Sequence, residues 1–527
     1  MPDLSRRAVL AAVPAALAAP RLARAASATT LRFIPQADVT VLDPLGTTAY
    51  PTRNHGHMCW DTLYGVDADG TVWPQLAEGH VTEDAGRRWT FTLRQGPTFH
   101  DGTPVRAADA VASIKRWMPR DSFGQVLQPR VDEIAALDDR RFVLRLNKPF
   151  GPLLDALAKA TSYPCFVYPE RFAAVDPAKP FTEVVGSGPY RFLASELVSG
   201  AQLAYGRFDK YVPAPTGPVS LSAGPKLARF ERVEWKVIPD PATAAAAVRA
   251  GEVDWWEEVP NDLVPVLSGQ KDVVLDEVNT SGTYAALRFN QLHPPFDDPA
   301  VRRAVAMAVN QADFMAAVAG DPKLWRDGVG CFPVASPLAN TAGLSLMTGK
   351  RDMDAARRVL ADAGKGGAPV LALHATNVSN QDALMSVGVD TLGKLGFKVT
   401  DNTMDWGSLL QRRTNTGPSA SGGWDVLVAL LSGAELNTPG GNLLLRANGK
   451  DAWFGWPTSD KLEALRTGWF DASDLQAQKT LAAALQEQFF ADLPYVPLGQ
   501  YFGQSAYRKG LVDVRRGIVL PLNARYG

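Results

Sequence analysis

The length of the chain, 527 residues, is the feature that most constrains its fold. A single hydrophobic core rarely grows beyond about 250–300 residues, so a chain of this size is expected to divide into at least two packed units. With 46% apolar and 21% charged residues, it has enough apolar side chains to fill such cores, and a disordered or collagen-like chain is excluded. We therefore expect two large lobes.

The charge balance narrows the possible partners. The chain carries 54 Lys and Arg against 55 Asp and Glu, a net charge of −1 with His neutral. A dedicated nucleic-acid binder needs a basic excess to displace counterions from phosphates, so we expect no nucleic-acid partner. Cys59, Cys165 and Cys331 are too few and too scattered for a disulfide framework. At most one bridge can form among them.

Residues 1–25 have the features of an export signal. Arg6 and Arg7 precede a run of Ala, Val and Leu, and the stretch ends in Ala23-Arg24-Ala25. This order resembles a bacterial twin-arginine signal with an Ala-x-Ala cleavage site. An Ala-rich tail without a targeting role is the alternative. The apolar run contains Pro14 and is shorter than the roughly 20 residues that span a bilayer, so we expect a soluble protein exported to the periplasm.

Local patterns in the second half predict alternating strands and helices. Val370–His374 and Phe397–Thr400 have strand length, and a helix is expected near Gln381–Leu395 between them. Together they predict a βαβ unit with a right-handed crossover. Asp298-Pro299 is a helix start signal, and the apolar stripe that follows predicts one helix ending at Gly320. We therefore expect an α/β protein.

A series of sequence blocks then indicates a resemblance to a known family. The blocks follow one another in a specific order: Trp60-Asp-Thr-Leu-Tyr64, Trp73-Pro-Gln-Leu-Ala-Glu78, Trp89-Thr-Phe-Thr-Leu-Arg94, Phe99-His-Asp-Gly-Thr-Pro104, Ala108-Asp109, Gly186-Ser-Gly-Pro-Tyr190, Gly251-Glu-Val-Asp254, Phe289-Asn290 and Pro295-Phe-Asp-Asp-Pro-Ala-Val-Arg-Arg-Ala304. In combination they resemble the family 5 extracytoplasmic solute-binding proteins of bacterial peptide and nickel ABC importers. The resemblance extends from about Leu31 to the C-terminus.

The resemblance implies a two-lobe clamp of the periplasmic-binding-protein type, in the large class with an extra subdomain and with the ligand cleft between the lobes. Lobe 1 would comprise residues 29–278 plus 495–527, with 46–185 as the extra subdomain, and lobe 2 would comprise 279–494. The two chain crossings, near Ser281-Gly282 and Leu493-Pro494, would form the hinge. Closure of the lobes would bury a solute and strengthen its polar contacts.

Tryptophans are the first candidates for contact with the solute. Trp424 precedes an expected strand, and Trp453 and Trp456 lie in a segment too dense in aromatic residues, Gly and Pro for a regular element. At least one of these rings is expected to face a cavity, and Trp406 joins them as a candidate. Trp255 and Trp256 are aromatic candidates as well, and the alternative for each of these rings is ordinary core packing.

The loop around Glu435 and Asn437 occupies the place where dipeptide and oligopeptide receptors hold an aspartate that pairs with the peptide ammonium group. Here the carboxylate is Glu435, one position away. The loop that would supply an arginine for the dipeptide carboxylate reads Thr376-Asn-Val-Ser-Asn380. Because a buried charge needs a partner, loss of both anchors favours a ligand other than a dipeptide.

The segment Asn54–Cys59 has two alternative interpretations. His55, His57 and Cys59 are side-chain types that bind copper, nickel or zinc. On a helix, however, residues two positions apart point in nearly opposite directions, so the two histidines would not chelate one ion. We therefore expect no metal or cofactor, and predict that Asn54 and His57 hydrogen-bond the ligand.

The sequence thus predicts a monomeric extracytoplasmic receptor that binds a peptide-like or other small polar solute and delivers it to a membrane ABC permease. A non-peptide solute, such as a nickel chelate, an opine or an oligosaccharide, is the alternative within this class. Outside the class, the alternatives are a metal-handling protein and a hydrolase using Cys59 or Cys165. Since no nucleophile elbow, phosphate-binding loop or His-Glu-x-x-His motif is present, we expect no catalytic residue.

Overall fold

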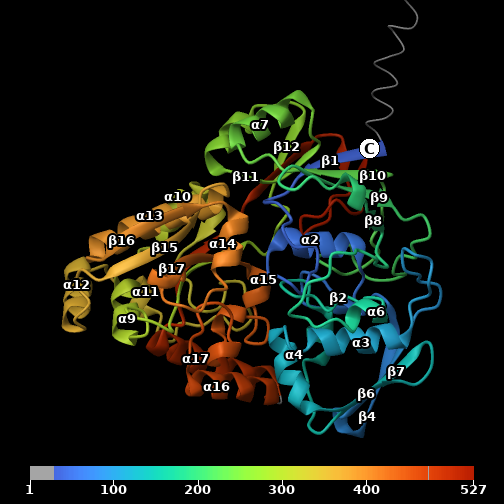
Figure 1. Ribbon diagram of the computed structural model, residues 1–527, viewed down its shortest axis with the longest axis horizontal. Coiled ribbons are helices and arrows are strands. Elements are labelled where there is room, and N and C mark those ends of the chain that lie inside the picture. The colour runs from blue at the N-terminus through green and yellow to red at the C-terminus, as the bar shows by residue number, and fades with distance from the viewer. Residues whose placement is uncertain (1–28, 473) are drawn as a thin grey trace, which may run out of the picture.

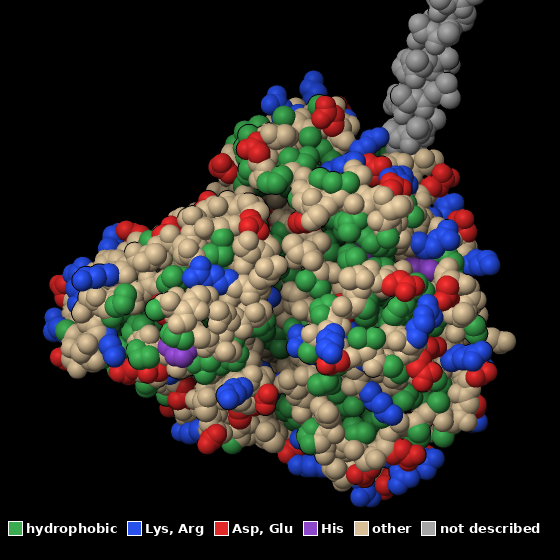
Figure 2. Space-filling view, viewed as in Figure 1, with side chains coloured by type: hydrophobic (Ala, Val, Ile, Leu, Met, Phe, Trp, Pro, Cys, Tyr) green, Lys and Arg blue, Asp and Glu red, His purple; other side chains and the backbone are tan. Residues whose placement is uncertain are grey.

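The computed structural model describes residues 29–472 and 474–527, and the predicted export signal lies outside them. Two large bodies stand side by side, each with a sheet of its own (Figure 1). On the face seen in Figure 2, acidic and basic side chains are interspersed, as the balanced composition leads one to expect. Within the described residues, no helix has the length and apolar character needed to cross a bilayer.

The first sheet has seven strands in the order β12-β19-β11-β1-β10-β9-β8. Its strands are β1 (Thr30–Ile34), β8 (Tyr190–Phe192), β9 (Gln202–Arg207), β10 (Arg232–Lys236), β11 (Trp255–Val259), β12 (Val273–Asp276) and β19 (Gln504–Arg508). The central strand β1 runs parallel to β10 and β11, whereas the outer pairs are antiparallel. The carboxyl ends of these three parallel strands therefore lie at one edge of the sheet.

The second sheet has six strands in the order β14-β18-β13-β17-β15-β16. Its strands are β13 (Thr283–Phe289), β14 (Trp325–Arg326), β15 (Pro369–Ala375), β16 (Lys398–Met404), β17 (Val426–Ser432) and β18 (Tyr495–Tyr501). Strand β15 is parallel to β16 and to β17, so these strands also end at a common edge. All seven side chains of β13 are buried, as expected for a central strand covered on both faces.

A four-stranded antiparallel sheet, in the order β4-β5-β7-β6, lies within the segment predicted as the extra subdomain. Its strands are β4 (Ala77–Glu83), β5 (Arg88–Leu93), β6 (Val131–Ala136) and β7 (Arg141–Leu146), and the pairs β2 (Tyr64–Val66) with β3 (Val72–Pro74) and β20 (Leu511–Val512) with β21 (Arg525–Tyr526) complete the strands. Phe123 and Phe150 from this segment pack on Phe470, with ring centroids 5.9 and 5.6 Å apart. The segment thus contacts the body that contains the second sheet.

Helices cover both large sheets, and others lie beside the four-stranded sheet (Figure 1). The helices of the described residues are α2 (Tyr50–Cys59), α3 (Ala107–Trp117), α4 (Ser122–Leu127), α5 (Leu153–Ala158), α6 (Glu170–Ala173), α7 (Pro241–Ala250), α8 (Val264–Ser268), α9 (Pro299–Ala308), α10 (Gln311–Ala319), α11 (Ser345–Thr348), α12 (Met353–Asp362), α13 (Ser379–Leu395), α14 (Trp406–Arg412), α15 (Gly433–Leu436), α16 (Asp460–Asp471) and α17 (Leu475–Asp492). The unit β15–α13–β16 confirms the predicted βαβ arrangement.

The single helix predicted from Pro299 to Gly320 is wrong, because two helices, α9 and α10, occupy that stretch. Val309 adopts extended backbone angles, φ −67° and ψ 123°. Its carbonyl accepts a hydrogen bond of 2.9 Å from the Arg351 guanidinium, so a distant side chain caps the end of α9. The apolar stripe nevertheless continues through the break.

The chain passes between the two large sheets twice. The first passage, 277–282, joins β12 to β13 and contains Ser281-Gly282. The second passage is Phe502-Gly503, between β18 and β19, whereas Leu493-Pro494 forms the turn between α17 and β18. Strand β18 pairs with β13 along its length, so residues 495–501 belong to the second sheet rather than to lobe 1. The division into lobes remains a prediction, with its second crossing moved to 502–503.

The two passages lie against each other. Gly282 has φ +63°, and a Cβ at this position would lie 2.8 Å from the Tyr501 carbonyl oxygen and 2.9 Å from the Phe502 ring. Thr283 is the partner of Tyr501 in the sheet. Because both connections are short and adjacent, they have the geometry of a hinge between the two bodies.

Arg288, at the centre of the second sheet, secures the segment that carries Trp453. The side chain is fully buried, and it donates to the carbonyls of Leu444, Trp453, Phe454 and Pro494 at 2.6–3.0 Å. Burial lowers the pKa of this guanidinium to about 9. One side chain of β13 therefore satisfies four backbone acceptors of an irregular stretch that could not pair in a sheet.

We expect Arg288→Met to lower the free energy of unfolding by about 3 kcal/mol, because it leaves four buried carbonyls without a donor. Urea denaturation measures the change. Arg145→Met is the matched control: this β7 side chain is 55% exposed and pairs with Glu133, so its loss should cost about 0.5 kcal/mol. Equal losses for the two variants would contradict the structural role of Arg288.

Candidate functional site

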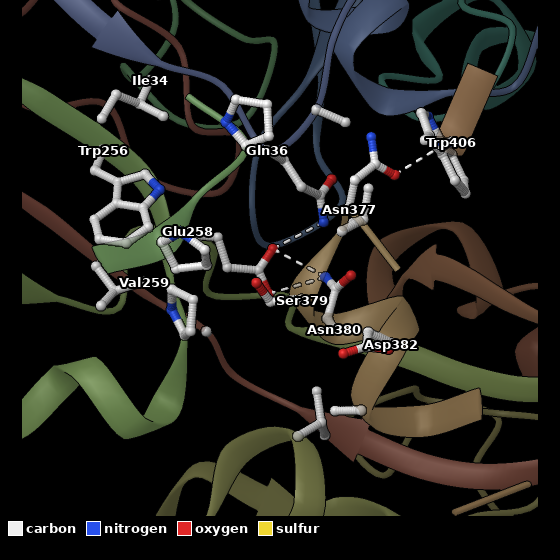
Figure 3. A pocket seen from close by; sticks show the side chains of 18 of the residues that line it. Ile34, Gln36, Trp256, Glu258, Val259, Asn377, Ser379, Asn380, Asp382 and Trp406 are labelled. Carbon is white, nitrogen blue, oxygen red and sulfur yellow. Dashed lines mark hydrogen bonds between the residues drawn. The ribbon is translucent and has the colours of Figure 1, made fainter. Parts of the chain in front are cut away.

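A cavity of about 700 Å³ lies between the two large sheets (Figure 3). From the first sheet it is lined by residues at and just beyond the carboxyl ends of β1, β10 and β11. From the second it is lined by the 376–380 loop after β15, by Asp405-Trp406 after β16 and by Tyr501 of β18. Ligands of α/β proteins bind at the carboxyl ends of parallel strands, so this is where both sheets predict a binding site.

Two smaller cavities, of about 50 and 40 Å³, continue from the large one. Gln36 lines all three, Asn380 and Trp406 line the large cavity and the 50 Å³ cavity, and Glu258 lines the large cavity and the 40 Å³ cavity. Because these residues line more than one cavity, the three cavities lie next to one another along the boundary between the two bodies.

Glu258 from β11 projects into the large cavity and meets residues of the second body (Figure 3). Its carboxylate accepts 2.8 Å from Gln36 Nε2 and 3.3 and 3.4 Å from Asn380 Nδ2. Tyr501 hydrogen-bonds it as well, and Asn380 also donates 2.9 Å to the Tyr501 hydroxyl. Burial raises the pKa of Glu258, and all of these partners are neutral groups.

Glu257, the adjacent residue, turns to the opposite side of the strand and anchors helix α2. Its carboxylate accepts 2.7 Å from the Gln36 backbone N–H and 3.0 Å from Asn54 Nδ2. Asn54 Oδ1 in turn accepts from the Arg53 guanidinium at 2.7 and 3.0 Å. Burial raises the pKa of Glu257 to about 7, although Arg53 and these hydrogen bonds act in the opposite direction.

Tyr50 and Glu435 form a second polar contact between the bodies. The Tyr50 hydroxyl donates 3.3 Å to Glu435 Oε2 and also accepts from the Ser432 backbone N–H. Ser162 donates 3.0 Å to the same Glu435 oxygen, whereas Oε1 has no hydrogen-bond partner among the described residues. Burial raises the pKa of Glu435, against the opposing effect of Lys159.

Arg413 is a buried cation at the wall of the 50 Å³ cavity. Its guanidinium lies 4.6 Å from the Phe454 ring centroid and 5.4 Å from that of Trp453. It donates 3.2 Å to the Thr48 hydroxyl, and within the described part of the chain it has no carboxylate partner and its Nε has no acceptor. Burial lowers its pKa to about 10, so aromatic faces and hydroxyls are what stabilise the charge.

The eight predicted ligand residues occupy four kinds of position. Trp406 lines the 700 and 50 Å³ cavities, and Trp453 lines the 50 Å³ cavity. Asn54 and Glu435 lie one layer behind, bonded to Glu257 and Tyr50 respectively. Asn437 lies away from the three cavities and uses its carbonyl to accept 2.9 Å from Ser336.

The other three predicted residues, His57, Trp424 and Trp456, are packed in the interior. Trp424 and Trp456 have ring centroids 5.9 Å apart, and Trp424 Nε1 donates to the Arg413 carbonyl. His57 Nε2 is 3.1 Å from the Ala160 carbonyl oxygen, and desolvation lowers its pKa. These three residues line none of the three cavities, because side chains of the core pack around them. Solute contact stays a prediction for all eight, with Trp406 and Trp453 best positioned.

The histidines of α2 point into different surroundings. His55 Nδ1 is 2.9 Å from the Tyr205 hydroxyl, whereas His57 packs at 5.0 Å on Phe166. Burial lowers the pKa of both imidazoles. Across residues 29–472 and 474–527, no group of three or more His, Cys, Asp and Glu is arranged to hold a metal ion. The divergence of the two rings is the one that helical spacing predicts.

Sequence reasoning missed Gln36, Glu258, Asn380 and Tyr501, which line the large cavity together with Trp256, one of the tryptophans considered from the sequence. One signal was present: Glu257-Glu258 follow Trp255-Trp256 in an otherwise apolar strand. Two adjacent carboxylates in a buried strand need a function or a partner. Whether these two carboxylates lie at a cavity depends on the direction in which β11 runs in the sheet. The local sequence pattern does not give that direction.

Glu257 generates a pH dependence of stability. Its pKa is near 4.5 in an unfolded chain and about 7 here, so between these values the folded state holds a proton that the unfolded state has released. The free energy of unfolding therefore falls as pH rises from 4.5 to 7, by on the order of 3 kcal/mol. In Glu257→Gln this loss is expected to disappear, and the variant should gain stability relative to the native chain over that range.

Urea denaturation at several pH values measures this difference, with Glu252→Gln, which alters an exposed carboxyl, as the control. The control should follow the native chain at every pH. A constant difference between Glu257→Gln and the native chain would contradict the assignment.

Comparisons with known proteins agree with this architecture. Residues 71–452 match the family model of bacterial extracellular solute-binding proteins, family 5. The chain is 34% identical over 509 residues, 95% of each chain, to a probable peptide ABC transporter periplasmic-binding protein of Sinorhizobium fredii. It is 25% identical to the glutathione-binding protein GsiB of Salmonella typhi, over 90% of this chain and 89% of that one.

Solved structures show the same fold. The periplasmic binding protein AgaA from A. tumefacien R10, in complex with agropinic acid, has a TM-score of 0.78 at 22% identity, covering 94% of this chain and 99% of that one. DppA from Helicobacter pylori, in complex with the peptide STSA, also has a TM-score of 0.78, at 21% identity, covering 94% of this chain and 98% of that one. Two sheets joined by adjacent crossings around a cavity are thus the two-lobe clamp of these proteins. The chain belongs to the bacterial extracellular solute-binding proteins of family 5.

Proposed function

We propose that this protein is a periplasmic receptor that holds a small polar solute between its two lobes and delivers it to a membrane ABC permease. The observation that carries the proposal is the 700 Å³ cavity, which is lined from both sheets at the carboxyl ends of parallel strands. The names of the relatives, which include a probable peptide transporter component and a glutathione-binding protein, support the same role.

The mechanism follows from the hinge and from the polar contacts across the cavity. A solute that touches both lobes shifts the open–closed equilibrium by its preference for the closed form. Closure excludes water, so each polar contact with the solute becomes stronger in the lower dielectric. The permease then recognises the closed shape. No bond of the solute is made or broken.

Properties of the cysteines support a role without catalysis. Cys59 and Cys165 are buried, and burial raises the pKa of both thiols. A cysteine nucleophile needs a lowered pKa and access to its substrate. Neither residue lines the large cavity.

The aspartate and the arginine that would anchor a dipeptide are missing at the expected positions. This difference separates the expected solute from a simple dipeptide. Loop 376–380 supplies amides and hydroxyls instead of an arginine, and Glu435 is already hydrogen-bonded by Ser162 and Tyr50. Arg413, whose Nε lacks an acceptor, offers a cation at a different place. We infer that the solute is peptide-like in size and polarity but is not held as a simple dipeptide.

A thermal-shift screen tests the function. The panel contains dipeptides, glutathione, agropinic acid, oligosaccharides and a nickel–histidine chelate. A true solute is expected to stabilise the protein by about 4 kcal/mol at a thousandfold excess over its Kd, and to reduce the radius of gyration in solution scattering. Trp406→Ala should weaken that stabilisation, because this ring lines two of the cavities.

Trp73→Ala is the matched control, since Trp73 is partly exposed and lies outside the three cavities. It should bind the solute as the native chain does. Failure of the whole panel to stabilise or compact the protein would reject the proposed function.

A further inference from the structure

The lining of the large cavity carries charge of one sign. Five carboxylates line it, and no Lys or Arg of the described residues does: Asp38, Glu258, Asp262, Asp382 and Asp405. Such a wall repels anions and attracts cations, and the low-dielectric surroundings strengthen both effects. The two basic residues nearest in the series, Arg53 and Arg413, line the small cavities instead.

Most of these carboxylates already have a local structural role. Asp405 caps α14 by accepting 3.0 Å from the Ser408 N–H, and Asp382 lies 2.8 Å from His374 Nε2. Asp38 accepts 2.9 Å from the Gly200 N–H, and Asp262 is exposed to solvent. Glu258 differs because it is desolvated inside the cavity and is neutralised by no cation of the described chain.

A second observation points independently to a hydrogen-bond donor in the cavity. Asn380 is 91% buried and lines the large cavity, and its Oδ1 has no hydrogen-bond partner among the described residues. Gln504, also in the lining, has an Oε1 without a partner. Figure 3 shows Asn380 beside Glu258, with its amide nitrogen bonded to the carboxylate and its oxygen directed elsewhere. A buried acceptor without a donor is costly unless a ligand supplies one.

Aromatic rings flank this group of acceptors. Trp256 lies on one side of Glu258, and Trp406 lies beyond Asn377 on the other (Figure 3). The indole face attracts cations, above all when water is excluded. Carboxylate, amide oxygens and indole faces share one preference, which is a positively charged donor.

We propose that the solute enters this cavity with a cationic group, an alkylammonium or a guanidinium, that pairs with Glu258 and donates to Asn380 Oδ1. This inference rests on the proposed function and specifies the solute class for that site. Glu258 comes from one lobe and Asn380 from the other, so a cation bound by both favours the closed form. The cationic end is assigned to Glu258 rather than to Glu435, because Glu258 lines the large cavity whereas Glu435 lines none of the three cavities.

Matched probe pairs that differ only in charge test the proposal. N-acetyl-Gly-Arg is compared with N-acetyl-Gly-citrulline, N-acetyl-Gly-Lys with N-acetyl-Gly-(Nε-acetyl)Lys, and butylguanidine with butylurea, by thermal shift and calorimetry. In at least one pair the cationic member should bind tenfold more tightly or better, the range expected for a hydrogen bond to a charged group. In Glu258→Gln that preference should fall below about threefold, whereas Glu252→Gln should retain it.

Asn380→Asp is a second test variant, for which the expected result is a gain in binding of the cationic probe rather than a loss. It places a second carboxylate beside Glu258, so the cationic probe should stabilise this variant by more than it stabilises the native chain. A preference that survives Glu258→Gln and disappears in Glu435→Gln would overturn the proposal. So would equal binding of both members of each pair, or binding of neither.

The thermal-shift panel of dipeptides, glutathione, agropinic acid, oligosaccharides and the nickel–histidine chelate distinguishes failure of the receptor function from failure of the cationic assignment. If agropinic acid, a sugar or the nickel chelate stabilises and compacts the protein while all cationic probes fail, the receptor function stands and the cationic assignment is wrong. If no solute of either panel does so, the receptor function itself fails.

Discussion

Pairing between β13 and β18, beside the two passages of the chain, is the constraint on which the arrangement of the site depends. Thr283 and Tyr501 are partners at the point where both segments leave the second sheet, and Gly282 has no room for a side chain against the Tyr501 carbonyl. With the passages held together, the carboxyl ends of the parallel strands of both sheets line the same cavity. The cavity, its walls from both lobes and its neighbouring small cavities follow from that geometry.

Buried charged groups then determine what the interior can accept. Arg288 is satisfied by four carbonyls and serves the fold, whereas Arg413 and Glu258 are met mainly by neutral groups. A buried charge without a counter-ion costs free energy in the absence of ligand. A ligand of opposite charge removes that cost when it binds, so these groups favour a particular ligand charge as well as a particular shape.

The family relationship accounts for the clamp but not for the side chains that line it. Residues 376–380 present amides and hydroxyls to the large cavity, and Glu435 accepts a hydrogen bond from Tyr50 of the other body. Relatives are described in complex with agropinic acid, in complex with the peptide STSA and as a glutathione-binding protein. The shared scaffold therefore fixes where a solute sits, and the side chains at the strand ends decide which solute it is.

Sequence alone determined the features that depend on local spacing or on length. Two lobes follow from the size limit of one core, the β15–α13–β16 unit follows from hydrophobic periodicity, and the divergence of His55 and His57 follows from helical geometry. Tertiary structure decided what depends on distant partners. Arg351 caps the end of α9, pairing with β13 moved the second crossing to 502–503, and core packing enclosed Trp424 and Trp456. Glu258 was visible as a residue but not as part of a site, because its neighbours Gln36, Asn380 and Tyr501 come from three distant segments that only the folded chain brings together.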